Sequence, residues 1–519
     1  MSEAGPPEHV GSARDGLPPS DRELQRTVID DPYSAVCVVL DRATESHRYE
    51  VEEAVLSAEE RRIATELHAA LPHILPGEHR PRSPAERLER VEHSAAEYLE
   101  THQPALEPAA RGRIVHCLAR DALGYGPIDA MMRDPEIEDI SCDGVGIPLY
   151  VFHARYESIP TNVRFSEESA LDSFVLLLGQ RCGRSLSVGR PILDGTTPEG
   201  HRVQATYGRE VTSRGASFTI RRFRDRPFTP VDLVLSGTAN EEMLAYLWLG
   251  AEHGESLIVC GGPGAGKTST LNAIALFIAP SAKIVSIEDV RELHLPHENW
   301  VAAATRDGIG DRGPDGKSLG EIDMFDLVRS ALRQRPSHIL VGEVRGREAY
   351  AMFQAMATGH ATYATMHADS VRAMVARLEN PPIRVPRVLL SSLRQVVVEA
   401  QVQTSRGSVR RIRQLVEIVR LEPETNELVT NPVYEWDPTT DTFRFQGHSY
   451  LLDRVATVTH RSAEEMRAEF DRRVRVIRYL VERRITDYRE LWLQIAEYYR
   501  DPEVVLERAA GPSPGGTNR

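Results

Sequence analysis

The chain has 519 residues, which is enough for about three domains. Its 41% apolar and 27% charged residues are ordinary for a globular protein, and no stretch reaches the ~18 uninterrupted apolar residues of a membrane span. The formal net charge of -14 argues against a nucleic-acid-binding surface, which is usually basic. Residues 1–21 lack the apolar core of a signal peptide, so we expect a cytoplasmic protein.

The five cysteines are scattered along the chain without the paired spacing of a metal site. We expect small buried side chains in a reducing compartment, with no disulfide and no zinc. The residues are Cys37, Cys117, Cys142, Cys182 and Cys260.

The first half of the chain changes texture twice. Residues 1–50 are mixed and poorly periodic, which predicts a partly disordered tail. Residues 51–120 predict a helical module, because S-x-x-E capping boxes begin at Ser57 and Ser83 and apolar residues recur at helical spacing. Short apolar runs between turn residues then predict an α+β domain over 121–223, with strands at 148–152, 203–206 and 217–220, and the following prolines predict a linker over 224–236.

The second half alternates strand-like and helix-like segments. Residues 237–455 are typical of an α/β domain with an added β region. We expect buried strands at 257–260, 283–287 and 338–341, a hairpin of 396–403 with 412–419 around the turn 405–407, and a second β pair through Tyr434 and Phe443. Residues 456–510 predict C-terminal helices and residues 511–519 a loose tail. One helical face is expected to carry Met466, Phe470, Val474, Ile477 and Leu480.

Residues 261–268 read GGPGAGKT between an apolar run and a helix-like run, which fits the P-loop pattern G-x-x-x-x-G-K-[ST]. Backbone N–H groups of such a loop, at a helix N-terminus, wrap a polyphosphate. Lys267 is expected to reach the β- and γ-phosphates of ATP, and the Thr268 hydroxyl to bind Mg²⁺. The predicted nucleotide-binding residues are Gly261, Gly262, Pro263, Gly264, Ala265, Gly266, Lys267, Thr268 and Ser269.

Two further segments place acids after expected strands, at the edge where α/β sheets bind their ligands. The strand at 284–287 is followed by two adjacent acids, and the first, Glu288, is the leading candidate to orient or deprotonate the attacking water. The strand at 338–341 is followed by Gly342 and Glu343 in a Walker B arrangement. We expect Glu343 to support Mg²⁺ through bound water.

The segment 358–368 holds two histidines, His360 and His367, among small residues. A histidine near the γ-phosphate can sense it by donating a hydrogen bond, and His367 is the candidate. The alternatives are a metal-binding pair, which lacks a third ligand nearby in sequence, or two satisfied core histidines.

Taken together, the four segments GGPGAGKT, SIEDVREL, ILVGEVRG and TGHATYATMHA resemble, in this order, the P-loop, Asp box, Walker B and His box of the type II/type IV secretion system ATPase superfamily. The resemblance covers about residues 120–450. The segments DISCDGVGIPLYV at 139–151 and SIEDVRELHLPHENW at 286–300 are most similar to the archaeal branch, which includes archaellum and archaeal pilus ATPases. The four-cysteine zinc module of many bacterial members is absent from this sequence.

The resemblance implies a RecA-like ATPase domain preceded by a smaller α+β domain and an N-terminal helical region, with a helical C-terminus. It further implies a homo-hexameric ring at the inner face of the cell membrane, bound to a polytopic platform protein. In this superfamily an arginine of the N-terminal domain completes the nucleotide site, and the matching residue is Arg221. The implied catalytic set is Glu288, Glu343, Lys267, Arg221 and His367, acting between two domains that open and close about the linker.

Four other functions are compatible with a P-loop. The ATPase of a DNA-transfer system belongs to the same superfamily. A RecA-like nucleic-acid motor predicts stimulation by single-stranded DNA and a basic groove, which the acidic composition disfavours. A small-metabolite kinase fits the long N-terminal region poorly, and a nucleotide-locked scaffold would release no phosphate.

Overall fold

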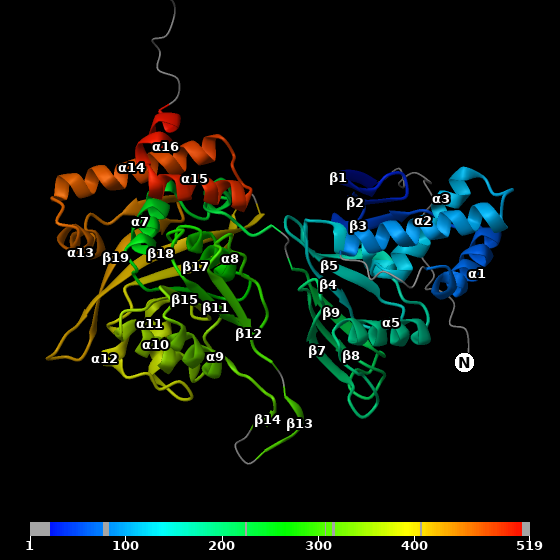
Figure 1. The fold of residues 1–519 in the computed structure, drawn as a ribbon, viewed down its shortest axis with the longest axis horizontal. Coiled ribbons are helices and arrows are strands. Elements are labelled where there is room, and N and C mark those ends of the chain that lie inside the picture. Colours follow the sequence, from blue (N-terminus) through cyan, green and yellow to red (C-terminus); the bar gives the residue numbers. More distant parts are fainter. Residues whose placement is uncertain are drawn as a thin grey trace, which may run out of the picture. The chain divides into compact units, whose positions relative to one another are not determined.

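The computed structural model describes residues 21–75, 83–223, 226–306, 308–313, 317–404 and 407–510. The chain divides into two compact units, Met1–Arg224 and Asp225–Arg519 (Figure 1). Each unit has its own large sheet and its own buried core.

The first unit is built on a nine-stranded sheet in the order β1-β2-β3-β6-β5-β4-β9-β8-β7. Neighbouring strands are antiparallel, except that β3 and β6 pair in parallel through Tyr49 and Thr161. The predicted strands at 148–152, 203–206 and 217–220 are confirmed as β5, β8 and β9. The bounds are β1 Asp21–Asp30, β2 Ser34–Asp41, β3 Ser46–Glu53, β4 Ile137–Cys142, β5 Pro148–His153, β6 Glu157–Arg164, β7 Ile192–Thr196, β8 Arg202–Thr206 and β9 Ser217–Arg221.

The predicted disordered tail is wrong for residues 21–50, which form β1 and β2 and most of β3; residues 1–20 lie outside the described part of the chain. Val36, Val38 and Tyr49 are buried in the same core as the strands of the α+β domain. The Tyr49 hydroxyl donates a 2.7 Å hydrogen bond to Asp134. These strands were hard to predict because β1 is a polar edge strand, and because β3 joins β6 across more than a hundred residues.

Three helices follow β3 and pack on one another around a small core of their own. They are α1 Ala58–Ile74, α2 Pro84–His102 and α3 Pro108–Ala122. The predicted capping box is confirmed at Ser57, which exchanges hydrogen bonds with Glu60, and Ser83 caps α2 by accepting from Glu86 N. Along the chain, these helices therefore follow β1–β3 and precede β4–β9 of the same sheet. They do not form a separate module ahead of the α+β domain. The remaining helices of this unit are η1 Gly126–Ile128, α4 Asp129–Arg133 and α5 Glu168–Arg181.

The second unit has a nine-stranded sheet in the order β12-β11-β15-β16-β10-β17-β18-β19-β20. The strands from β12 to β17 run parallel, and β17 to β20 are antiparallel. The three predicted buried strands and both predicted β pairs are confirmed. The bounds are β10 Leu257–Gly261, β11 Ile284–Glu288, β12 Trp300–Ala304, β15 His338–Val341, β16 Ala361–Met366, β17 Gln395–Thr404, β18 Gly407–Leu421, β19 Leu428–Asp437 and β20 Thr442–Phe445, with a separate pair β13 Ile309–Arg312 and β14 Ser318–Leu319.

Helices cover both faces of this sheet, as the predicted α/β fold requires (Figure 1). One face packs against α6 Pro230–Leu235, α7 Glu241–Glu252, α8 Lys267–Ala275 and the C-terminal helices α13 Tyr450–Val458, α14 Ala463–Glu482, α15 Tyr488–Arg500 and α16 Pro502–Ala509. The other face packs against α9 Met324–Ala331, α10 Glu348–Ala357, α11 Val371–Glu379 and α12 Arg387–Leu390, with η2 Leu332–Gln334 after α9. The predicted apolar face of α14 is buried in the first of these cores.

The linker predicted at 224–236 is too long, because α6 occupies its second half. Thr229 and Asp232 form a capping box around Pro230, and Val231 and Leu233 are buried in the core of the second unit. The pattern T-P-x-D was the signal for a helix start, and the two prolines obscured it. In the described part of the chain, every helix is too short or too polar to span a bilayer.

Candidate nucleotide site

The P-loop connects β10 to α8 and contains two glycines in the left-handed region, Gly264 at φ 69° and Gly266 at φ 106°. Glycine adopts this conformation at the lowest cost. At Gly266 there is also no room for a side chain, since a Cβ there would lie 2.6 Å from Oε1 of Glu399. Glycine is therefore required at Gly266 both for the backbone conformation and for the available space.

Lys267 begins α8 and is only 8% exposed. Its Nζ donates to the backbone oxygen of Gly262 at 2.8 Å and lies 3.4 Å from Nδ1 of His367. Burial lowers the pKa of the lysine, and the nearby carboxylates of Glu343 and Glu399 oppose that shift. A buried ammonium group is best stabilised by a closely bound anion, and a polyphosphate in the loop supplies one.

Glu343 follows β15, His367 follows β16, and the two side chains meet at the same sheet edge as the P-loop. His367 Nε2 lies 3.0 Å from Glu343 Oε1, while Arg345 forms an ion pair with the other carboxylate oxygen. Burial is the largest influence on the His367 pKa and lowers it, and Lys267 lowers it further. The predicted Walker B acid and His-box histidine are therefore joined to the P-loop lysine through direct side-chain contacts.

Glu288 is the last residue of β11 and is only 1% exposed. Its Oε1 accepts from the backbone N–H groups of Glu292 and Leu293 at 2.9 and 3.0 Å, whereas Oε2 has no hydrogen-bond partner in the described ranges. Burial raises the pKa of this carboxyl to about 7. Gly342 makes room for it, because a Cβ there would lie 3.0 Å from Glu288 Cγ. A carboxyl with a pKa near neutrality and one unused oxygen suits a general base.

The residues predicted to hold Mg²⁺ fit that ion by their chemistry. Thr268 is the second residue of α8 and offers a hydroxyl, and Glu343 offers a carboxylate whose Oε1 lies 3.0 Å from His367 Nε2 and whose Oε2 pairs with Arg345. Both are hard oxygen donors, the class that Mg²⁺ prefers, and Mg²⁺ commonly binds through one carboxylate and several waters. The donor set therefore supports the predicted metal role of Thr268 and Glu343.

His360, the other histidine of the segment 358–368, lies away from this cluster. His360 precedes β16 and His367 follows it, so the strand places the two histidines at opposite sheet edges and they cannot share a metal ion. Arg221 ends β9 in the first unit, is exposed, and donates from Nε to Asp139 at 3.1 Å. Its role in the nucleotide site stays a prediction.

Comparison with known proteins identifies the family. Residues 144–481 match the family model of the type II/IV secretion system proteins, which is more than half of the chain. The chain belongs to this family.

Proteins similar to this chain come from archaea and bacteria. An uncharacterized protein of Methanocaldococcus jannaschii, MJ0900, is 38% identical over 74% of this chain and 69% of its own length. The conjugal transfer protein TrbB of Rhizobium radiobacter is 31% identical over 44% of this chain and 68% of its own length. The crystal structure of the VirB11 ATPase from the Brucella suis type IV secretion system, in complex with sulphate, is 24% identical and covers 56% of this chain and 91% of its own, with a TM-score of 0.28.

Two ionisable residues at the P-loop of this family member were not predicted from the sequence: Glu399 lies beneath the loop and Arg410 beside it. Glu399 pairs with Gly261 in the register of β17 and β10, is 2% exposed, and has a pKa raised to about 8 by burial. Its Oε2 has no hydrogen-bond partner within the described segments. Arg410, on β18, donates from Nε to the backbone oxygen of Gly264 at 2.9 Å. The available signal was an acid directly after three valines of an expected buried strand.

Proposed function

We propose that this protein binds ATP with Mg²⁺ in its P-loop, hydrolyses it, and uses the energy to drive a pilus- or secretion-type machine. The observation that supports this best is the chain of contacts from Lys267 through His367 to Glu343, behind the glycine loop. It brings together the first residue of α8 and residues that follow β16 and β15, which are distant in sequence. Glu288 ends the neighbouring strand β11 at the same edge.

Each side chain has a role that its environment supports. Phosphate oxygens would replace the Gly262 carbonyl as the acceptor of Lys267. Mg²⁺, when bound, would neutralise phosphate charge, with the Thr268 hydroxyl as a ligand and Glu343 holding its water shell. Glu288 would take the proton of the attacking water on its unused Oε2. His367 would exchange its contact with Lys267 for a hydrogen bond to the γ-phosphate.

The test of the enzymatic role is phosphate release by purified full-length protein with Mg²⁺ and ATP. Lys267→Ala is expected to reduce the rate to background, because it removes the buried ammonium group that would bind the β- and γ-phosphates. The chain offers a matched control, Lys283→Ala, at the opposite end of β11 from Glu288. Unchanged hydrolysis in the Lys267 variant, or equal loss in both variants, would reject the proposal.

The proposal includes a hexameric ring bound to a polytopic platform protein at the cytoplasmic face of the membrane, and it extends to an archaeal pilus or archaellum. Support for this part is the family membership and the similarity to an archaeal relative. Mass photometry with ATP is expected to show six copies, and pull-down from detergent-solubilised membranes is expected to recover one multi-spanning protein. Arg221→Gln, compared with Arg222→Gln, tests whether the arginine matched by resemblance supports hydrolysis.

A DNA-transfer machine is the second candidate, because the relative TrbB is named as a conjugal transfer protein. It predicts that DNA-processing proteins, rather than pilin-like proteins, are recovered with the membrane partner. A RecA-like nucleic-acid motor is a weaker candidate, since the chain carries a net charge of -14. Stimulation of ATP hydrolysis by single-stranded DNA would favour it over secretion.

A further inference from the structure

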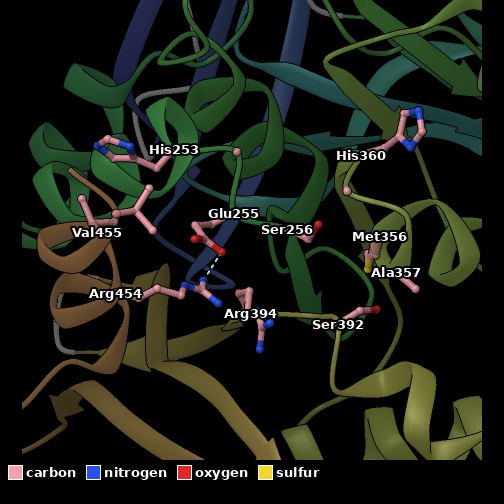
Figure 2. A pocket seen from close by; sticks show the side chains of 13 residues that line it. His253, Glu255, Ser256, Met356, Ala357, His360, Ser392, Arg394, Arg454 and Val455 are labelled. Carbon is pink, nitrogen blue, oxygen red and sulfur yellow. Dashed lines mark hydrogen bonds and ion pairs between the residues drawn. The ribbon is translucent and has the colours of Figure 1, made fainter. Parts of the chain in front are cut away.

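A cavity in the second unit is lined by residues that precede β10, β16 and β17, at the opposite edge of the sheet from the P-loop. Figure 2 shows the side chains that line it. Its volume is about 370 Å³, within the range of small-molecule sites. The lining comes from residues just before β10, β16 and β17, together with α13. Because the P-loop follows β10 and the cavity precedes it, the five-residue strand separates the two sites by roughly 16 Å.

The cavity contains two guanidinium groups for one carboxylate. Arg454, on α13, forms an ion pair with Glu255, and its Nε is buried without a hydrogen-bond partner among the described residues. Arg394 stands beside this pair and donates from Nη1 to the backbone oxygen of Ser391 at 3.1 Å (Figure 2). Burial and repulsion from Arg454 both lower the pKa of Arg394. Two close guanidinium groups with one carboxylate leave an excess positive charge that an anion would balance.

The backbone around these groups is held in place. The Ser256 carbonyl accepts from Gln395 N at 3.0 Å and from Arg394 N at 3.3 Å, and its side chain accepts from Thr362 N at 3.1 Å. On the other side, Glu417 fixes the start of α13 by accepting from Tyr450 N and Leu451 N. The arginines therefore project from rigid elements, which lowers the entropic cost of binding a ligand.

Further donors line the same space. The Ser256 hydroxyl accepts one bond and keeps its own proton for donation. His360, which the nucleotide site does not use, is also among the lining residues and contacts Thr358 Oγ1 through Nδ1 at 3.2 Å. Guanidinium forks, a hydroxyl and an imidazole are the groups that bind phosphate in proteins.

We propose that this cavity binds a phosphate group carried by a small molecule, at a site separate from the P-loop. Arg394 is the principal ligand, since its guanidinium group forms no ion pair with a carboxylate of the described residues, and Arg454 and Ser256 complete the set, with His360 in the wall of the cavity. The helix ends of α7 and α10 also lie at this edge, and their carbonyl groups reduce the positive potential. Selectivity must then come from bidentate hydrogen bonding rather than from charge alone. The proposal is independent of whether the protein hydrolyses ATP.

The experiment is isothermal titration of full-length Lys267→Ala protein with pyrophosphate, so that binding at the P-loop is suppressed. One saturable site per chain is expected, and Arg394→Gln is expected to weaken it by roughly tenfold or more. Arg475→Gln removes the same charge from an exposed position on α14 and serves as the control. Val458→Glu, at a rim position that is 69% exposed, is a second variant that adds an opposing charge without disturbing the core.

Weaker binding in Arg394→Gln and Val458→Glu, but not in Arg475→Gln, supports the site. Absence of binding in the Lys267→Ala background overturns it, since pyrophosphate then binds only at the P-loop. Equal weakening by the Arg475 control also overturns it, because a general charge effect then explains the result. Succinate distinguishes the ligand class, and binding of succinate as tight as that of pyrophosphate rejects the phosphate assignment.

Discussion

Replacing Glu288 by glutamine separates the chemical role of this residue from its effect on stability. Glutamine has the same shape, and its carbonyl oxygen can accept the two backbone bonds from Glu292 and Leu293 that Oε1 accepts. The variant should therefore fold. It cannot accept a proton from water, so the rate of ATP hydrolysis is expected to fall by about 10²–10⁴, or roughly 3–5 kcal/mol in the barrier.

The same variant is expected to be more stable at high pH. The pKa of Glu288 is raised from 4.5 to about 7 on folding, so the folded state favours the neutral carboxyl. The stability that this carboxyl contributes is complete below pH 4.5 and is lost as the pH rises to about 7. Above pH 7 the parent has lost roughly 3 kcal/mol of folding stability through this pKa shift, and the glutamine variant does not undergo that loss.

The assay is urea unfolding at pH 5 and pH 8, followed by tryptophan fluorescence. Trp248, Trp300, Trp436 and Trp492 are all four tryptophans of the chain and lie in the second unit, so the signal reports that unit. Glu288→Gln should raise the urea midpoint more at pH 8 than at pH 5, whereas Glu298→Gln, an exposed control, should not. For the parent, the rate of hydrolysis should rise about tenfold from pH 6 to pH 8 if Glu288 is the base. A variant that keeps the parent rate, or gains no stability at pH 8, would refute the reasoning.

Three further changes test the site and the fold. Gly266→Ala should weaken binding of a fluorescent ATP analogue at least about tenfold, because a positive φ costs about 1–3 kcal/mol for alanine and the new Cβ would meet Glu399. The control is Gly447→Ala, which has a similar φ cost in a turn without such a contact and should bind the analogue normally. Glu399→Gln should resist urea better than the parent above pH 8 and as well as the parent below pH 4.5. The reason is that burial raises the pKa of the parent carboxyl to about 8, so its stabilising effect is lost as the pH rises through that range. Identical pH profiles of the two proteins would contradict this. Tyr49→Phe should lower the stability of the first unit by about 1–3 kcal/mol in calorimetry, through loss of the buried bond to Asp134, and an unchanged transition would show that β3 is not part of that core.

The sequence alone determined the local parts of the nucleotide site. The P-loop pattern has glycine at 264 and 266, and both residues adopt the left-handed backbone conformation that favours glycine. Apolar runs before Glu288 and Glu343 predicted buried parallel strands, and the structure has β11 and β15 at those places, whereas the strand β16 before His367 was not predicted. Because parallel strands end at one sheet edge, the placement of both acids there followed from the pattern.

Strand pairings and burial that depend on partners far away in sequence could be known only from the tertiary structure. Residues 21–53 carry too weak a pattern to predict strands, and they become part of a sheet only because β3 pairs with β6. Glu399 is an ordinary acid in the sequence, and its burial beneath Gly266 comes from the position of β17 beside β10. Likewise, Arg394 and Arg454 line one cavity because α13 packs against β18, the strand that pairs with β17. Sequence periodicity reports which face of an element is buried, whereas the identity of the neighbour depends on chain topology.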